Sequence, residues 1–196
     1  GVDLLTGDIR WEQSLGSAPL EPRAAGGRVY LATERKTFLR MHASSGRLEP
    51  HVRVGAIVRG QAAVDDRHVY FSGLDNTLWA IDRGDGAIEW RKGITYRPAA
   101  GPVLLAGFVV VPGADVKALP AYIARTGAAA GEIAFPEMLS RAPVLGVAAD
   151  GSTFALGITG NLANEWTLTL LGPSAKPILT VEPLKALPGE VVGVGP

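Results

Sequence analysis

The residues of this chain that could do chemistry are few and lie far apart in the sequence. The three histidines, His42, His51 and His68, fall in different predicted strands or loops, and none has a partner at a spacing typical of a metal site. The chain has no cysteine, which removes disulfides, thiolate nucleophiles and thiolate metal sites together. We therefore expect no metal site, and we interpret His42 as a hydrogen-bonding residue of a hairpin.

Three further stretches look like parts of known sites but lack the residues that would complete them. Ser44-Ser45-Gly46 does not match the G-x-S-x-G pattern of a nucleophile elbow. Asp75-Asn76 offers oxygen ligands, yet Ca²⁺ needs about six to eight oxygens and no acidic loop supplies the others. Gly107 and Gly113 are not followed by the Gly-Lys-Ser/Thr ending of a phosphate loop. The sequence thus predicts no catalytic, cofactor-binding or metal-binding residue and no cofactor.

A repeated phrase marks the elements that would have to position any site. Its best copy, Ala-x-Asp-x-x-Asp-Gly-x-x-x-Trp, runs from Ala80 to Trp90, and altered copies recur about every 40 residues. These copies comprise Asp3, Thr6, Gly7 and Trp11; Arg40, His42, Gly46 and Pro50; and Ala121, Ile123 and Gly127, with Gly131 and Phe135 restoring the glycine-to-aromatic spacing after an insertion. A second marker keeps nearly the same period at 29–31, 69–71, 109–111 and 153–155. Such a period indicates stacked or radially arranged units.

Each unit also contains turn residues between short apolar runs. Gly26-Gly27, Asp65-Asp66, Ala106-Gly107 and Asp150-Gly151 suit the tight turns of hairpins, and Ser45-Gly46 and Asp85-Gly86 mark a second hairpin. Units of roughly 40–45 residues with about four strands are the blades of a β-propeller. Because 25 glycines and 14 prolines interrupt every candidate helix, we predict an all-β fold of four-stranded antiparallel blades.

The repeated phrase resembles the tryptophan-docking repeat of the quinoprotein-like, or PQQ-like repeat, β-propellers. That superfamily includes quinone-dependent alcohol dehydrogenases and the outer-membrane assembly lipoprotein of Gram-negative bacteria. The resemblance implies that Ala and Trp stack between neighbouring blades and that Gly permits a close hairpin. It assigns docking roles to Asp3, Gly7, Trp11, Gly46, Ala80, Asp82, Gly86, Trp90 and Gly127. No such contact is expected of the second copy, where Arg40 and Pro50 replace Ala and Trp, or of the fourth.

The repeats predict one propeller domain over residues 1–196, with about five blades visible. The expected units are 1–18, 19–57, 58–97, 98–140 and 141–186, with another starting at 187–196. The C-terminal strand near Val191 could join the N-terminal strands in one shared blade of a five-bladed wheel. Alternatively the chain is an arc of a larger wheel, and we favour the arc because an open wheel would leave a bare sheet edge.

The charge and the absence of expected site residues decide between classes of function. Zero net charge gives no electrostatic case for nucleic acid, and no apolar run is long enough to span a membrane. The resemblance implies that the dehydrogenases need a vicinal cysteine disulfide, calcium ligands and an aspartate base, whereas this chain lacks cysteine. We therefore predict a non-enzymatic scaffold that binds protein partners in a periplasmic, or otherwise extracytoplasmic, assembly at the outer membrane. A fragment of a PQQ-dependent quinoprotein dehydrogenase is the alternative.

Two segments are candidate partner surfaces. Asp115–Glu132 is expected to protrude as a longer loop that interrupts the repeat, with Asp115, Lys117, Arg125 and Glu132 as candidate contacts. A tolerated surface insertion would explain the same segment. Pro173–Pro196 is expected to form an irregular last blade or an edge that another chain completes.

Overall fold

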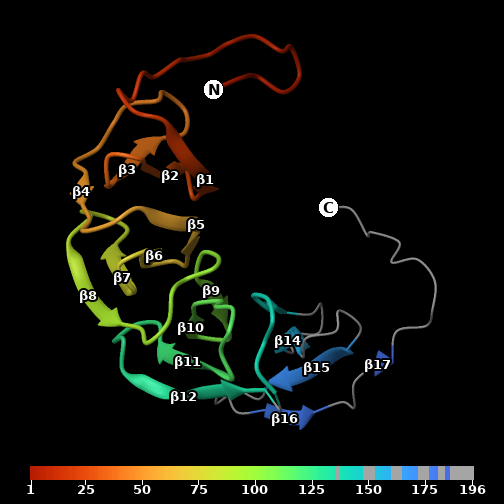
Figure 1. The fold of residues 1–196 in the computed structure, drawn as a ribbon. Helices are drawn as coiled ribbons and strands as arrows, with labels where there is room; N and C mark the ends of the chain where they lie inside the picture. Colours follow the sequence, from red (N-terminus) through yellow and green to blue (C-terminus); the bar gives the residue numbers. More distant parts are fainter. Residues whose placement is uncertain (136, 148–152, 160–164, 172–176, 181–183, 186–196) are drawn as a thin grey trace.

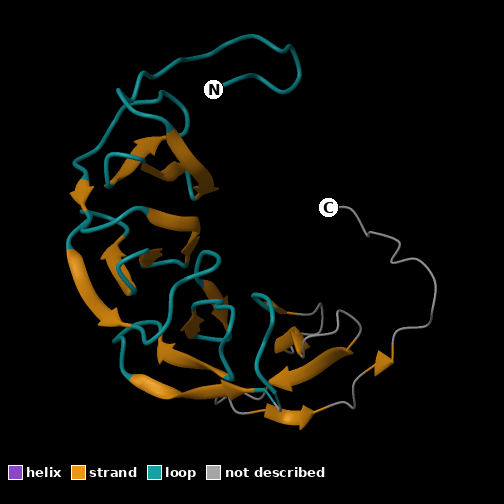
Figure 2. Ribbon diagram, viewed as in Figure 1, coloured by secondary structure: helices purple, strands orange, loops and turns teal. Residues whose placement is uncertain are grey.

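The structure, a computed structural model, describes residues 1–135, 137–147, 153–159, 165–171, 177–180 and 184–185. Strands and loops account for all of these residues (Figure 2). Four sheets follow one another along an arc (Figure 1). The turn at Asp150-Gly151, the strand near Val191 and most of Pro173–Pro196 lie outside the described residues.

Each sheet is a meander in which consecutive strands pair antiparallel. The first contains β1 (Pro19–Ala25), β2 (Arg28–Thr33), β3 (Thr37–His42) and β4 (Val52–Arg53). The second contains β5 (Val58–Val64), β6 (His68–Gly73), β7 (Thr77–Asp82) and β8 (Ile88–Gly93). The third contains β9 (Val103–Leu105), β10 (Phe108–Val110), β11 (Ala118–Ile123) and β12 (Ala129–Ala134). The fourth contains β13 (Val144–Val147), β14 (Thr153–Thr159), β15 (Glu165–Leu171) and β16 (Pro177–Thr180), with β17 (Leu184–Lys185) also paired to β15. This arrangement confirms the predicted all-β fold of four-stranded antiparallel blades.

The core lies between the faces of neighbouring sheets. Phe38 of β3 stacks on Phe71 of β6, with ring centroids 4.2 Å apart, in a cluster that joins the first and second sheets. Tyr70, the neighbour of Phe71 on β6, points the other way into a cluster with Val109 of β10. Successive side chains of a strand point to opposite faces of its sheet. A central strand whose sheet has a neighbouring blade on each face therefore needs apolar residues at successive positions. This explains why the marker at 69–71 is a continuous apolar run.

The first strand of each sheet lines the inner side of the arc. β1, β5 and β9 follow one another there (Figure 1), and β13 is in contact with β9. In β5 a register irregularity between Arg59 and Ala63 bends the strand at Gly60. The backbone of Gly60 touches that of Gly101, which precedes β9, so a Cβ on Gly60 would lie 2.8 Å from the Gly101 Cα. Two glycines therefore let the second and third sheets meet backbone to backbone.

The prediction that Asp115–Glu132 forms one protruding loop was wrong. Most of this segment is the hairpin of β11 and β12, paired from Ala118↔Ala134 to Tyr122↔Ala129. The extra length of the third sheet lies instead before β11, in residues 111–117. There the N–H of Asp115 donates to the Leu139 carbonyl at 2.9 Å, which ties the connection to the following segment.

Candidate functional site

The first contact between repeats is made by Trp11. Its indole ring lies on Gly46, where a Cβ would collide with the six-membered part of the ring. Its Nε1–H donates to the carbonyl of Ala43 at 2.8 Å. Gly46 has a φ of 68°, a left-handed conformation that glycine adopts without strain. The glycine thus both turns the hairpin and admits the ring of the preceding unit.

Trp90 repeats this contact with the third sheet. Its ring lies on Gly127, where a Cβ would be 2.7 Å from Cδ2, and its Nε1–H donates to the carbonyl of Ala124 at 3.0 Å. Ala80, directly opposite Trp90 in the β7–β8 pairing, is fully buried. A small residue at position 80 therefore leaves room beside the indole. The hydroxyl oxygen of Tyr70 lies 3.1 Å from the same Ala124 carbonyl.

The aspartates of the phrase close the hairpins that present these glycines. Asp82 accepts the N–H groups of Gly84 at 2.6 Å and Asp85 at 3.0 Å through Oδ1. These hydrogen bonds, with that from Asp85 contributing most, lower the pKa of Asp82. Asp3 accepts the N–H groups of Leu5 and Thr6 in the same way. Gly7 and Gly86 follow with φ of 78° and 82°, so both copies form the same turn.

In the second repeat Arg40 takes the place of the tryptophan. Its guanidinium lies on Gly86, where a Cβ would be 2.6 Å from Cζ. Nη1 donates to the carbonyls of Arg83 at 3.2 Å and Gly84 at 3.4 Å, and Nη2 donates to that of Asp85 at 2.8 Å. Arg83 precedes Gly86 as Ala43 precedes Gly46, so the arginine reaches the carbonyl equivalent to the tryptophan's acceptor. The expectation that this copy makes no docking contact was wrong, because an arginine on β3 replaces an indole on the fourth strand.

A carboxylate compensates the buried charge of Arg40, whose side chain is only 2% exposed. Glu49 Oε2 lies 3.4 Å from Nη2 of Arg40, and Oε1 accepts Nε–H of Arg28 at 2.8 Å. Burial opposes ionisation of Glu49, but the hydrogen bond from Arg28 and the charges of Arg28, Arg40 and His42 outweigh it and lower the pKa. His42 Nε2 lies 3.1 Å from Oε1, as suits a hydrogen-bonding hairpin residue.

A buried polar group of the second sheet supports the Trp90 contact. Asp65 accepts the hydroxyl of Tyr70 at 2.7 Å and the N–H of His68 at 2.5 Å. Burial first, and then the charge and hydrogen bond of Asp65, raise the pKa of Tyr70 well above its usual range. Tyr70 therefore stays a neutral hydroxyl that donates its one proton to Asp65 and lies close to the carbonyl that accepts the Trp90 indole.

The four predicted interface residues do not form one surface loop. Asp115 and Lys117 are exposed in the connection before β11. Arg125 is exposed in the β11–β12 turn at the opposite end of that strand, and Glu132 is exposed on β12. Gly131 is opposite Ala121 in the pairing, and Phe135 is buried against Gly157 of β14. The aromatic of the fourth copy thus packs on a strand of the next sheet.

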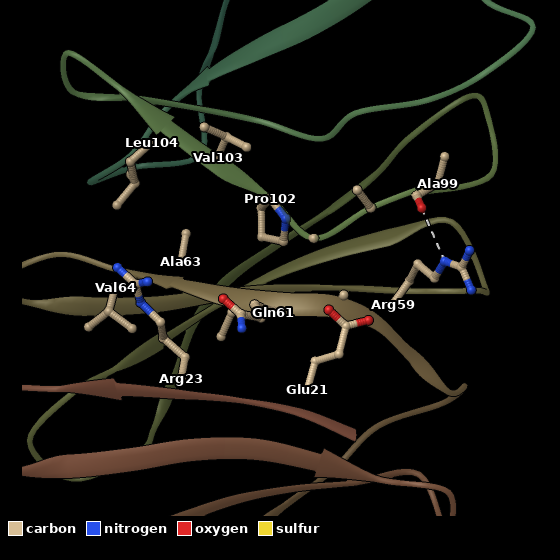
Figure 3. A pocket seen from close by; sticks show the side chains of 14 residues that line it. Glu21, Arg23, Arg59, Gln61, Ala63, Val64, Ala99, Pro102, Val103 and Leu104 are labelled. Carbon is tan, nitrogen blue, oxygen red and sulfur yellow. Dashed lines mark hydrogen bonds between the residues drawn. The ribbon is translucent and has the colours of Figure 1, made fainter. Parts of the chain in front are cut away.

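A hollow of about 640 Å³ lies on the inner side of the arc between β5 and the segment before β9 (Figure 3). Glu21 and Arg23 of β1 form its lower edge, and Arg59 of β5 donates from Nε to the carbonyl of Ala99 at 3.1 Å. The side chain of Gln61 lies between Arg23 and Arg59 (Figure 3). The wall therefore mixes charges of both signs. Among the described residues, no three acidic or histidine side chains gather as a metal site, and no helix is long enough to cross a membrane.

Replacing Trp90 tests the docking contact. Trp90→Phe keeps a ring on Gly127 but leaves the Ala124 carbonyl without the indole donor, so we expect a loss of about 1–2 kcal/mol in the free energy of unfolding. Trp90→Ala should cost about 3–5 kcal/mol. Trp79→Phe is the matched control, because the buried Nε1 of Trp79 has no hydrogen-bond partner among the described residues. Urea denaturation measures all three; equal losses for the two phenylalanine variants would contradict the role of the Trp90 hydrogen bond.

The family and the fold are also found by comparison. A family model described as outer membrane protein assembly factor BamB matches residues 1–142. The chain is similar to the crystal structure of BamB from Moraxella catarrhalis, with a TM-score of 0.63 and 15% identity, over 89% of this chain and 65% of that chain. It is similar to hydrazine synthase from Kuenenia stuttgartiensis, with a TM-score of 0.63 and 12% identity, over 82% of this chain and 47% of that chain. No curated protein sequence matches.

These comparisons agree with the geometry of the repeats. At such identities the two structures share the propeller fold with this chain and nothing further follows from them. The family match spans the N-terminal hairpin and the first three sheets, where the docking contacts of Trp11, Arg40 and Trp90 lie. The resemblance to the PQQ-like repeat propellers is therefore confirmed, and the chain belongs to the family of the outer membrane protein assembly factor BamB.

Proposed function

We propose that this chain is a non-enzymatic scaffold that holds protein partners in a periplasmic assembly serving the outer membrane. The observation that carries the proposal is the unbroken series of docking contacts. Three successive repeats each place one large side chain on the next hairpin glycine and bond its backbone carbonyl. The docking residues of the repeat therefore hold neighbouring blades together, and a scaffold requires such a rigid arrangement.

The edges and loops of the blades are the surfaces that such a scaffold offers. The fourth strands β8 and β12 are the outer strands of their sheets, and exposed sheet edges can accept an added strand from a partner. β8 carries Glu89, Arg91 and Lys92, charges that discourage edge pairing, whereas Glu132 is the one charged residue of β12. The interface role of Asp115, Lys117, Arg125 and Glu132 belongs to the same proposal.

The proposal is tested by deleting the gene in the source organism and quantifying outer-membrane β-barrel proteins by mass spectrometry of membrane fractions. We expect their abundance to fall and the wild-type gene to restore it. A gene with Arg125→Glu and Glu132→Lys should restore it less well than one with the exposed Arg67→Glu. Unchanged abundance would contradict the scaffold. Dehydrogenase activity of the purified protein that requires added quinone and Ca²⁺ would instead support the dehydrogenase alternative.

A further inference from the structure

A second hollow, of about 540 Å³, lies on the outer part of the first sheet. Residues 14–17 of the N-terminal segment form one wall, and the strands β3 and β4 form the other. We call it the basic groove, after the side chains at its rim: Arg35, Lys36, His51 and Arg53. Its size is within the range of roughly 300–1,000 Å³ of pockets that hold ligands.

An equivalent groove occurs at the same place in the second sheet. Thr37↔Arg53 and Thr77↔Gly93 are matching pairs, so Leu39 corresponds to Trp79 and Arg53 corresponds to Gly93. The groove at Trp79 has about 480 Å³ and includes Gly55 of the first sheet's exit loop. It therefore stays open between two complete four-stranded sheets. The basic groove thus has one equivalent, in the second sheet.

The two grooves differ in what fills them. At the second sheet the Trp79 ring occupies the floor, and Arg91 lies over it with Cζ 5.8 Å from the ring centroid. The carboxylate of Asp75 adds a negative charge beside Gly55. In the basic groove Leu39 replaces the indole, and Arg35 stands at the position of Asp75. The first sheet thus has a leucine for the aromatic and an arginine for the acid, and it has His51 and Arg53 where the second sheet has Arg91 and Gly93.

The cations of the basic groove are uncompensated. Arg35, Lys36, His51 and Arg53 are exposed, and within the described part of the chain none of them makes an ion pair. No acidic residue is among those that line the groove. Some basic groups of the chain have an acidic partner, as Arg28 has Glu49. Three permanent cations around one hollow, Arg35, Lys36 and Arg53, produce a local positive potential that selects an anionic ligand.

The apolar floor and the strand edge of the groove restrict the class of anionic ligand that fits it. Leu15, Leu39 and Leu48 provide an apolar floor, with Leu48 40% exposed. β4, which carries Arg53, is the outer strand of its sheet, and an outer strand is where an extended chain can be added. A free phosphate would leave the apolar floor uncovered, and a lipid headgroup cannot pair with a strand edge.

We propose that the basic groove binds an extended acidic segment of a partner protein. Its carboxylates contact Arg35, Arg53 and their neighbours, and an apolar side chain rests on Leu39 and Leu48. This inference rests on the proposed scaffold function and names the chemistry of one partner segment. Because surface charge pairs are screened by salt, binding weakens as ionic strength rises.

The test uses a fluorescein-labelled peptide in which glutamate alternates with leucine and serine, and fluorescence anisotropy with the full chain at low salt. Arg35→Glu/Arg53→Glu should weaken binding at least tenfold, and Leu48→Ser about threefold. Arg67→Glu/Arg141→Glu, which makes the same change in net charge at exposed positions away from the groove, should stay within twofold of wild type. All four side chains are exposed, and circular dichroism confirms folding.

Other outcomes overturn the inference. Equal loss in the two double variants would show a general charge effect, and equal binding of a peptide with glutamine for glutamate would exclude recognition of acid. Inorganic phosphate, or vesicles of phosphatidylglycerol, binding more tightly than the peptide and depending on Arg35 and Arg53 would assign the groove to that ligand instead. Loss of outer-membrane proteins on gene deletion, with no peptide binding, would leave the scaffold standing and reject this groove alone.

Discussion

Gly60→Ala is expected to lower the free energy of unfolding by about 2–5 kcal/mol. Gly60 has a φ of 70°, where an added Cβ costs about 1–2 kcal/mol. The same Cβ would collide with the backbone nitrogen of Gly101 and lie 2.8 Å from its Cα. Backbone atoms cannot swing aside as a side chain can, so the second and third sheets must separate, at a further cost of about 1–3 kcal/mol. Urea denaturation followed by far-ultraviolet circular dichroism measures the loss.

Two other glycines distinguish the cost of a positive φ from the cost of the collision with Gly101. Gly107 has a φ of 88° with nothing within 4 Å of an added Cβ, so Gly107→Ala should cost about 1 kcal/mol from the backbone alone. At Gly93, which has open space and no positive φ, the same change should cost less than about 0.5 kcal/mol. A loss at Gly60 no larger than that at Gly107 would show that the sheets do not touch there.

The propeller could be predicted from the sequence because its determinants are local and repeated. A hairpin glycine such as Gly86 and an apolar run such as 69–71 each report on one strand or one turn, and a period of about 40 residues needs no knowledge of distant contacts. The contact between Gly60 and Gly101 could not be predicted in this way. It joins two irregular stretches in different units, and neither glycine belongs to a repeated phrase.

The role of Arg40 was missed for a different reason, although a signal was present. When the copies are compared one position at a time, Arg40 and Pro50 each count as a departure from the repeated phrase. Arg40 and Pro50 stand 40 residues before Ala80 and Trp90, which are directly opposite each other in the β7–β8 pairing. One copy has the large residue at the first position and the small one at the second, and the other copy has the reverse order. Comparing the two positions as a pair would have revealed the exchange.

The basic groove was missed because its cations come from two separate segments of the chain.

Arg40→Ala is expected to destabilise the protein by about 3–5 kcal/mol, as removal of one partner of a buried ion pair does. Three carbonyls of the next hairpin, from Arg83 to Asp85, lose their donor, and Glu49 keeps a buried charge with less compensation. The loss should be greater at neutral pH than at acidic pH. Glu49 has a lowered pKa, so protonating it as pH falls removes the negative charge that Arg40 neutralises.

Pro50→Trp in the same chain should recover at least about 1.5 kcal/mol of that loss, because it rebuilds the alanine-and-tryptophan pair of the third repeat and lets an indole reach Gly86. Pro50→Trp alone should destabilise, since the guanidinium of Arg40 already lies on that glycine. The three variants and the wild type form a double-mutant cycle whose coupling energy is measured by urea denaturation. If the two changes were simply additive, Arg40 would be a buried cation of the first sheet and not the docking residue of its repeat. A favourable coupling energy would establish that one inter-blade contact can be made by either of two chemistries, an indole from the fourth strand or a guanidinium from the third.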